Sequence, residues 1–433
     1  MKKVLCLIAV LALLLTGCRA EVAPGETTAE TTIETEAQTQ PETTENQEPG
    51  EAWAVLTPPL DYEIINGFAK TPTHYYAPHD GGIVRAPISD IAKQEKIPLP
   101  GSYEGMKLSG AEICGITKDW LFVNVWEARE KERHGPDDYG EYYEYENYEN
   151  RKVVTYRVAM GSWKAEALLA GVYDYRPLPW YNSASDSLLI PQTVADDTRL
   201  DVIFEAMSMT TRKRSPVQMD GEQLAIGFWS SWWQNTLDGN AALVDCQTSE
   251  YNDYYIFDRD NQAQRKALED ISFPKHWDDW GMREAPKNKA EEELREEAGV
   301  YATAGDYFYY APPDSSGMKR DLYRIKVDGT ERELLRKGSN IIQLCSVSGK
   351  LFCQAYHPTE KRGESRRIDM YLLNEEGKVE EVLFKYWDNT EGNSGYGLMP
   401  YGDKLMITYG VIYGPSSFVF LYDPATGATF PAQ

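Results

Sequence analysis

Two groups of tryptophans, one of which contains two carboxylates, are the residues of this sequence whose types suggest ligand binding. The stretch Phe228–Trp233 holds three tryptophans, and Trp277 and Trp280 flank Asp278 and Asp279. Indole rings stack on sugar rings and on cationic side chains, and a carboxylate at the ring edge binds hydroxyls or a cation. The sequence therefore predicts a ligand-binding site made of Trp229, Trp232, Trp233, Trp277, Asp278, Asp279 and Trp280. The alternative for each ring is that it fills space inside the fold.

Motifs for catalysis and metal binding are weak. Residues 272–275 match the SxxK pattern, but Pro274 interrupts the helix in which that serine nucleophile must stand. Residues 258–269 have calcium-loop spacing, but Ala263 stands where a glycine is needed to turn the loop. The five histidines are scattered, and His74 and His79, which we expect on opposite sides of a hairpin turn, are better explained as surface residues than as metal ligands. We therefore predict no catalytic residue, no metal ligand and no cofactor.

The N-terminus carries an export signal. Lys2 and Lys3 precede an apolar run, Val4–Leu15, which is too short to span a bilayer as a helix but fits the apolar region of a signal peptide. Leu15-Thr16-Gly17-Cys18 resembles the lipobox of bacterial lipoproteins. The resemblance implies cleavage before Cys18, so that residues 1–17 are removed, and attachment of a diacylglyceryl group to its thiol. An anchor in the cell membrane follows, with the chain facing outside the cytoplasm.

Residues 18–51 read as the lipidated cysteine and a disordered tether. Glu, Thr, Pro, Gln and Ala dominate, and no Lys or Arg occurs between Arg19 and Lys70. Such a composition buries too little apolar surface to offset the entropy lost on ordering.

The chain carries a net charge of −24. Three bases in the first 19 residues and nine Glu in 20–51 leave −18 for residues 52–433. An acidic body excludes nucleic acid as a partner.

Four cysteines remain after the signal and the lipid site. They are Cys114, Cys246, Cys345 and Cys353, and no CxxC pair occurs. Cys345 and Cys353 flank a Ser348–Gly349 turn, so they could form a disulfide across a hairpin or stay as reduced thiols buried in strands. The sequence leaves both open and favours the thiols.

A repeat organises residues 52–433. A turn followed by a short apolar strand recurs at Gly305–Tyr310, Gly349–Phe352 and Gly402–Ile407, with earlier copies at Lys118–Phe122 and Gly221–Ile226. An outer hairpin follows each copy, as at Leu322–Leu335. Four-stranded units of about 40–50 residues are typical of β-propeller blades. We count seven units, near 61–100, 108–171, 172–217, 218–270, 298–337, 340–385 and 395–433.

The C-terminal third resembles a known family. Leu322–Thr330, which follows Asp306–Tyr310, is similar to low-density-lipoprotein-receptor-like propellers of bacterial lipoproteins, which are related to TolB-type propellers. The resemblance implies a propeller that binds a ligand or partner outside the cytoplasm, and it provides no catalytic residues.

The sequence thus predicts an all-β protein: a seven-bladed β-propeller at 52–433, for which six or eight blades would be a counting difference. Residues 52–57 would close the ring, a helix is expected at 285–298, and 271–297 is an insertion. The predicted function is a non-enzymatic binding or scaffold lipoprotein that recognises a cell-wall glycan, a peptide or a surface protein through its face loops. The alternative is an extracellular hydrolase or lyase of glycan or peptide with carboxylates at the channel.

Overall fold

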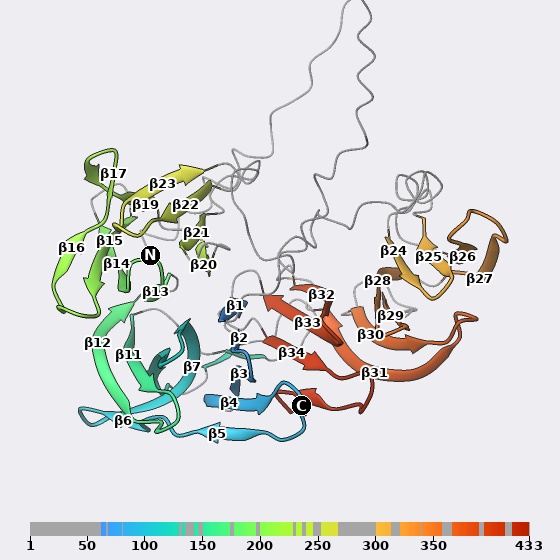
Figure 1. Ribbon diagram of the computed structural model, residues 1–433, viewed down its shortest axis with the longest axis horizontal. Helices are drawn as coiled ribbons and strands as arrows, with labels where there is room; N and C mark the ends of the chain where they lie inside the picture. The colour runs from blue at the N-terminus through green and yellow to red at the C-terminus, as the bar shows by residue number, and fades with distance from the viewer. Residues whose placement is uncertain are drawn as a thin grey trace, which may run out of the picture. The chain divides into compact units, whose positions relative to one another are not determined.

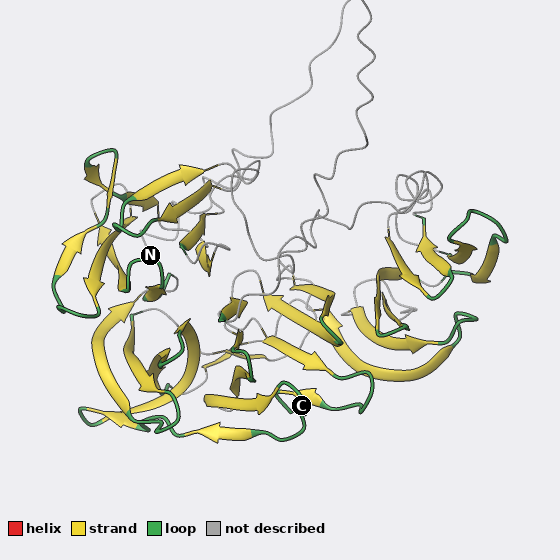
Figure 2. Cartoon of the chain, in the orientation of Figure 1, coloured by secondary structure: helices red, strands yellow, loops and turns green. Residues whose placement is uncertain are grey.

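Antiparallel β-strands make up every regular element that the structure, a computed structural model, describes (Figures 1 and 2). It describes residues 62–65, 68–79, 81–129, 132–134, 143–145, 150–173, 177–195, 200–227, 231–235, 240–245, 253–266, 300–312, 321–338, 340–356, 366–388, 394–411 and 418–432. In these residues no helix is long and apolar enough to cross a membrane.

The strands form consecutive sheets, numbered here in chain order. The first is β1 (Glu63–Ile65), β2 (Phe68–Lys70), β3 (His74–His79), β4 (Gly82–Pro87) and β5 (Glu95–Ile97). The second is β6 (Ser102–Tyr103), β7 (Met106–Ile116), β8 (Trp120–Glu127), β11 (Arg151–Ala159) and β12 (Ala165–Tyr173). The third is β13 (Trp180–Asn182), β14 (Ser187–Ala195), β15 (Leu200–Ser208) and β16 (Arg214–Pro216), with β19 (Ala225–Gly227) also on β15.

Four-stranded sheets follow. The fourth is β20 (Ser231–Asn235), β21 (Ala241–Asp245), β22 (Asp253–Phe257) and β23 (Ala263–Lys266). The fifth is β24 (Val300–Ala304), β25 (Tyr307–Ala311), β26 (Leu322–Lys326) and β27 (Glu333–Arg336). The sixth is β28 (Ile341–Val347), β29 (Lys350–Tyr356), β30 (Arg366–Leu373) and β31 (Val379–Asp388). The seventh is β32 (Ser394–Tyr401), β33 (Lys404–Val411), β34 (Phe418–Tyr422) and β35 (Thr429–Phe430). Two small hairpins accompany them, β9 (Glu132–His134) with β10 (Tyr143–Tyr145), and β17 (Gln218–Met219) with β18 (Glu222–Gln223).

Local sequence explains the tight turns. Ser348 and Gly349 join β28 to β29, and both have positive φ, 52° and 76°. Two consecutive residues with positive φ make the type I′ turn that suits the right-handed twist of a β-hairpin. The turn-then-strand repeat predicted from the sequence therefore corresponds to real hairpins. Its Gly221–Ile226 copy is assigned to the wrong sheet, because β19 pairs with β15 of the third sheet.

Hydrophobic side chains join successive sheets. One buried cluster combines residues of the first four sheets, a second joins the fifth to the sixth, and a third joins the sixth to the seventh. The first and seventh sheets also pack together, with Phe68 against Tyr401 at 6.1 Å and against Phe430 at 6.0 Å between ring centroids. Consecutive antiparallel sheets packed in this way have the architecture of a β-propeller. The predicted all-β propeller fold is therefore confirmed, while the blade count stays a prediction.

Side-chain amides add polar ties between neighbouring sheets. Asn124 donates to the Pro179 carbonyl (2.9 Å), Asn182 to the Phe257 carbonyl (3.0 Å), and Gln343 to the Leu398 carbonyl (2.9 Å). Gln94 donates to the Thr429 carbonyl (2.7 Å) and accepts from the Ala432 backbone (2.9 Å). All four amides bond to backbone atoms of the next sheet, or of the chain beside it, so each sheet is fixed against its neighbour.

The register of β28 and β29 decides the cysteine question. Leu344 pairs with Cys353, and Cys345 pairs with Phe352. Successive strand residues point to opposite faces, so Cys345 and Cys353 lie on different faces and belong to different hydrophobic clusters. No disulfide joins them, and both are buried, as is Cys114. The prediction of buried thiols is confirmed for these three residues.

Some predicted features lie outside the described residues. These are the signal peptide, Cys18, the tether, the strand at 52–57, the insertion 271–297 with its helix, and Cys246.

Candidate ligand-binding face

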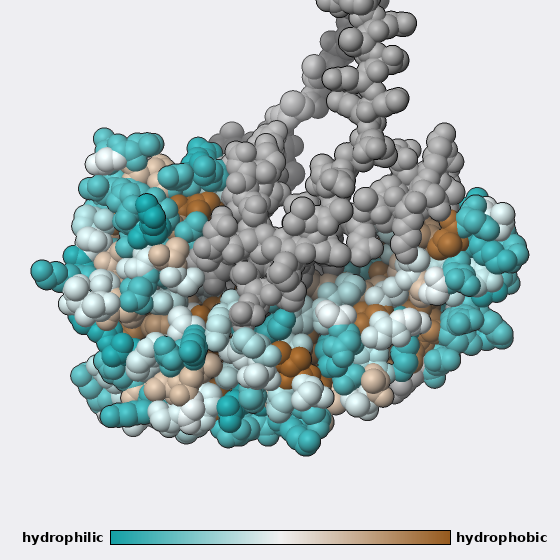
Figure 3. Space-filling view, in the orientation of Figure 1, coloured by the Kyte–Doolittle hydropathy of each residue, from teal (hydrophilic) through white to brown (hydrophobic). Residues whose placement is uncertain are grey.

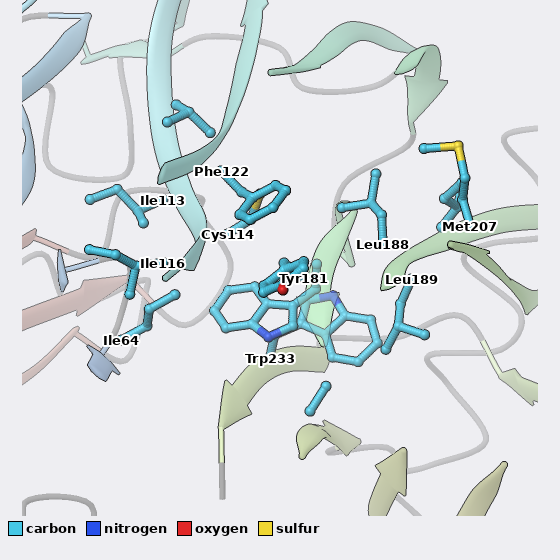
Figure 4. Packing of buried hydrophobic residues seen from close by; sticks show 14 of the residues in the cluster. Ile64, Ile113, Cys114, Ile116, Phe122, Tyr181, Leu188, Leu189, Met207 and Trp233 are labelled. Carbon is cyan, nitrogen blue, oxygen red and sulfur yellow. The ribbon is translucent and has the colours of Figure 1, made fainter. Parts of the chain in front are cut away.

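Trp233 is the predicted site residue whose side chain the structure describes. It is 8% exposed, and its indole Nε1 donates to the Leu178 carbonyl at 2.8 Å. Its ring stacks on Trp180 at 6.2 Å and meets Phe257 at 5.3 Å between centroids. Figure 4 shows it among buried side chains of the first three sheets, including Ile64, Phe122 and Leu189. The prediction that Trp233 contacts a ligand is therefore wrong, because the ring is part of the core.

The other predicted site residues lie mostly outside the described part of the chain. Trp232 belongs to β20 and pairs with Val244, but its side chain is not described. Trp229, Trp277, Asp278, Asp279 and Trp280 are outside the described residues. The described strands nevertheless fix where the chain enters and leaves the fourth sheet.

The segment that carries Trp229 and the segment that carries Trp277 and Trp280 join the fourth sheet at the same end. The sheet order is β20-β21-β22-β23 and every pair is antiparallel, so the start of β20 and the end of β23 share one end. Trp229 lies two residues before β20, and Trp277 follows β23 after residues 267–276. Neighbouring strands are about 4.8 Å apart, so the start of β20 and the end of β23 are separated by about 14 Å across the sheet. The segments that carry the two tryptophan groups therefore join the fourth sheet at the same end.

The lengths of the connections distinguish the two ends of the second and the fourth to seventh sheets. At the end that we call the hairpin end, the turns between consecutive strands of a sheet hold two to six residues, as in 305–306 and 423–428. At the end that we call the connection end, apart from the turn 104–105 between β6 and β7, the segments between consecutive strands of a sheet hold six to 23 residues: 128–150, 246–252, 312–321, 357–365 and 412–417. Of the segments between these sheets at the connection end, 267–299 is long, whereas 337–340 and 389–393 are short. Binding residues concentrate on loops that a rigid scaffold positions. The connection end is therefore the candidate ligand-binding face.

A polar clamp fixes the fourth sheet to the third at the hairpin end. Asn182 is fully buried; its amide donates to the Phe257 and Asp258 carbonyls at 3.0 and 3.1 Å, and its oxygen accepts from the Ala241 backbone at 3.1 Å. Asn261 donates to the Ser187 hydroxyl at 3.2 Å. Because this amide and the Trp233 core hold the sheet, the loops at its other end start from a rigid base.

Two arginine–tryptophan stacks brace the first two sheets. The Arg85 guanidinium lies 4.5 Å from the Trp163 ring centroid, and that of Arg157 lies 4.4 Å from the Trp120 ring. Arg157 also pairs with Glu166 at 2.7 Å, and Glu166 pairs with Arg212 of the third sheet at 2.9 Å. This set, which we call the arginine brace, thus links three successive sheets.

Backbone conformation marks two residues of the arginine brace. Trp163 and Arg212 have positive φ, 55° and 59°. Each closes a hairpin with the same hydrogen bonds as the one that Gly427 closes, since its amide donates to the carbonyl four residues earlier. A bulky residue in this left-handed backbone conformation costs about 1–2 kcal/mol of folding free energy relative to glycine. Because these side chains are the ones that reach a neighbouring sheet, we attribute the strain to the brace. The sequence signal was available: Trp163 and Arg212 stand where an equivalent hairpin has glycine.

Burial and charge set the protonation of His74 beside this brace. Desolvation, followed by the positive charge of Arg85, lowers the pKa of His74 below its ordinary value. His74 is therefore neutral at pH 7. Within the described residues, no group of three or more His, Cys, Asp or Glu could hold a metal ion.

Comparison with known proteins gives structural similarities only. No family model matches, and no curated protein matches. A prolyl endopeptidase is 10% identical with a TM-score of 0.33, over 85% of this chain and 48% of its own length, so this chain spans about half of it. TolB from Acinetobacter baumannii is 10% identical with a TM-score of 0.21, over 65% of both chains. The β-propeller domain of the Trilobed protease from Pyrococcus furiosus is 10% identical with a TM-score of 0.27, over 73% of this chain and 81% of that domain. These scores are low, so the sheets themselves define the class, an all-β protein of the β-propeller type.

Proposed function

We propose that the chain is a binding or scaffold lipoprotein, anchored in the cell membrane by a lipid on Cys18 and exposed outside the cytoplasm. Its connection end would recognise a cell-wall glycan, a peptide or a protein partner. The observation that carries this proposal is the unequal length of the connections within the sheets, at most six residues at the hairpin end and up to 23 at the connection end. A scaffold that has short turns at one end and long loops at the other is suited to recognition by those loops.

Trp229, Trp277, Asp278, Asp279 and Trp280 are the residues we propose for the contact. Their segments join the same end of the fourth sheet, and the sheet beneath them is fixed by Trp233 and Asn182. Tryptophan rings bind sugars by stacking, and the adjacent carboxylates would accept bonds from hydroxyl groups. A cationic peptide side chain would use the same groups.

The alternative is an extracellular hydrolase or lyase with paired carboxylates. Glycoside hydrolysis needs two carboxyl groups about 5–10 Å apart that face a common substrate. The three buried carboxylates of the described residues make packing contacts instead. Glu63 accepts from the Tyr401 hydroxyl at 2.8 Å, Asp369 accepts from the Tyr371 hydroxyl at 2.9 Å, and Asp423 pairs with Lys404 at 3.4 Å. Glu63 lies in the first sheet, Asp369 in the sixth, and Asp423 directly after β34 of the seventh. These contacts favour the binding hypothesis.

Tryptophan substitutions test the proposed face. Trp277→Ala and Trp280→Ala should weaken binding to purified cell-wall glycan in a sedimentation assay, with little change in the melting temperature. Trp233→Ala is the matched control, and it should destabilise the fold by about 3–5 kcal/mol because it empties a core position. If the Trp277 and Trp280 variants lose several degrees of stability, those rings are packing residues and the proposed face is wrong.

Metabolic labelling with a lipid probe tests the anchor. The wild-type chain should be labelled and recovered with membranes, whereas Cys18→Ala should lose the label and be released. Cys114→Ala is a suitable control, because Cys114 is buried in the second sheet. Equal labelling of the Cys18→Ala variant would contradict lipidation at this residue.

A further inference from the structure

One face of the fifth sheet packs on the sixth sheet, and its other face carries a row of tyrosines. Tyr301, Tyr310 and Tyr323 are in register across β24, β25 and β26. The rings of Tyr310 and Tyr323 stack at 5.5 Å between centroids, with 22° between their planes. Tyr310 is fully buried and Tyr323 is half-buried, in a hydrophobic cluster whose described members all come from the fifth sheet. The row therefore ends in a ring that is partly open to solvent.

Arg332 lies over the end of this row. Its guanidinium is 5.2 Å from the Tyr323 ring centroid and 5.5 Å from that of Tyr310, yet the residue is exposed. A guanidinium contacts rings through its flat face and donates hydrogen bonds from its edge. The contacts with the two rings therefore hold the cation in place and leave its N–H groups able to bind an acceptor.

The comparable exposed stacks of this protein include a carboxylate. Three arginines each contact a ring and also pair with a glutamate, at 2.7 to 2.8 Å: Arg85 with Trp163 and Glu95, Arg157 with Trp120 and Glu166, and Arg324 with Tyr307 and Glu333. Arg151, which contacts Trp126, is buried and donates to the Glu127 carbonyl at 3.3 Å. Arg332 has its rings, but none of the described carboxylates pairs with it. The pattern is thus complete except for the carboxylate.

Carboxylates close to Arg332 in the sequence already have partners. The three in the hairpin 322–338 are bonded as follows: Glu331 to Lys326, Glu333 to Arg324, and Asp328 to the backbone amide and the hydroxyl of Thr330. The chain as a whole is acidic, with a net charge of −24, so an unneutralised arginine in such a hairpin is a local exception. Charge complementarity therefore calls for an anionic group from outside the hairpin.

An exposed leucine adjoins the same ring. Leu334 is in register with Tyr323 and is 38% exposed. Figure 3 shows a mostly hydrophilic surface with small separate hydrophobic areas, so an exposed large apolar side chain is unusual here. Tyrosine and arginine are enriched at the centres of protein interfaces, where apolar contact surrounds a charged anchor. A sugar would gain little from the leucine, whereas a peptide can supply an apolar side chain next to an acidic one.

We propose that Tyr323, Arg332 and Leu334 form a docking site for an acidic peptide segment of a partner protein. A carboxylate of the partner bonds to the Arg332 guanidinium, and an apolar side chain beside it covers Leu334. The site is built on strands and a turn of the fifth sheet rather than on the loops of the connection end. It does not rest on lipidation or on the proposed ligand-binding face.

Saturation-transfer nuclear magnetic resonance on the full chain tests the proposal. The probe is the capped peptide Gly-Glu-Leu-Gly, which should receive saturation with an affinity on the order of millimolar, as expected for one charged anchor and one apolar contact. The matched probe Gly-Gln-Leu-Gly should bind about tenfold more weakly, because its amide lacks the charge of the carboxylate.

Two pairs of variants locate the site. Arg332→Gln should abolish peptide binding, whereas Arg336→Gln should keep it, because Arg336 is also exposed without a carboxylate partner among the described residues but pairs with Leu322, which packs toward the sixth sheet. Leu334→Ala should weaken binding about two- to fivefold. Val379→Ala on β31, at 39% exposure, is its control and should bind as the wild type does. All four variants should keep the melting temperature of the wild type, since the side chains are exposed.

Three outcomes would overturn the inference. Equal binding of the peptide to the wild type and to Arg332→Gln would show that Arg332 is not the anchor. No saturable binding of the peptide would show that water satisfies the guanidinium. Binding of polygalacturonate, an acidic glycan, that depends on Arg332 while the peptide does not bind would assign the surface to a glycan.

Discussion

The contact between the first and last sheets offers a quantitative test of the fold. The Tyr401 hydroxyl donates to Glu63 Oε2 at 2.8 Å, and the two residues are 5% and 1% exposed. Tyr401→Phe keeps the ring, which packs on Phe68 and Tyr75, and removes this donor. Loss of one partner of a buried hydrogen bond costs about 1–3 kcal/mol, so the folding equilibrium should weaken by a factor of about 30.

Urea unfolding provides the assay. A loss of about 2 kcal/mol with a slope of about 3 kcal/mol per molar lowers the midpoint by about 0.7 M, and the slope itself should stay unchanged. Tyr323→Phe is the control, because its ring stacks on Tyr310 at 5.5 Å and the change leaves that stack in place. If the Tyr401→Phe midpoint lies within error of the Tyr323→Phe midpoint, the hydrogen bond between the first and last sheets does not stabilise the fold.

Three further outcomes are expected. Burial raises the pKa of Tyr371 and of Cys353, each to about 12, so the unfolded chain releases these two protons at lower pH than the folded chain. The free energy of unfolding, measured with urea at several pH values, should therefore be unaffected by these groups below about pH 8.5 and should fall as the pH rises from there toward 12. Cys114 and Cys353 are buried, so a thiol reagent should modify them only after denaturation; rapid labelling of the native protein at either residue would contradict their placement. Trp163→Gly relieves strain but loses the stack with Arg85, and a double-mutant cycle with Arg85→Ala should give a coupling of about 0.5–2 kcal/mol; zero coupling would refute the brace.

Local patterns in the sequence were sufficient to predict the hairpins. The Ser348–Gly349 turn and the apolar strand after it form as expected, because a tight turn and an alternating strand are specified by neighbouring residues. Buried thiols were also predictable, since cysteine in an apolar strand is usually core.

Contacts between sheets could not be predicted from the same patterns. Trp233 and Trp232 are adjacent in one motif, yet the burial of Trp233 depends on Trp180 and Phe257, which are distant in sequence. The Gly221–Ile226 copy was assigned to the fourth unit because periodicity identifies a strand without its partner. His74 and His79 were expected on opposite sides of a turn, but they begin and end the single strand β3. The arginine brace was missed because its parts come from three sheets.

The side-chain amides that join neighbouring sheets constrain the sequence on one side of each sheet boundary more than on the other. Asn124, Asn182, Gln343 and Gln94 must keep their side chains, but the groups they meet in the neighbouring sheet include backbone carbonyls, which every residue provides. Substitutions at Pro179, Phe257, Leu398 or Thr429 therefore leave the tie itself intact. The tie itself therefore constrains the sequence on the donor side of each boundary only, and Phe257 and Leu398 on the acceptor side are constrained by their burial instead. A chain built in this way can diverge far in sequence while its sheets keep the same neighbours.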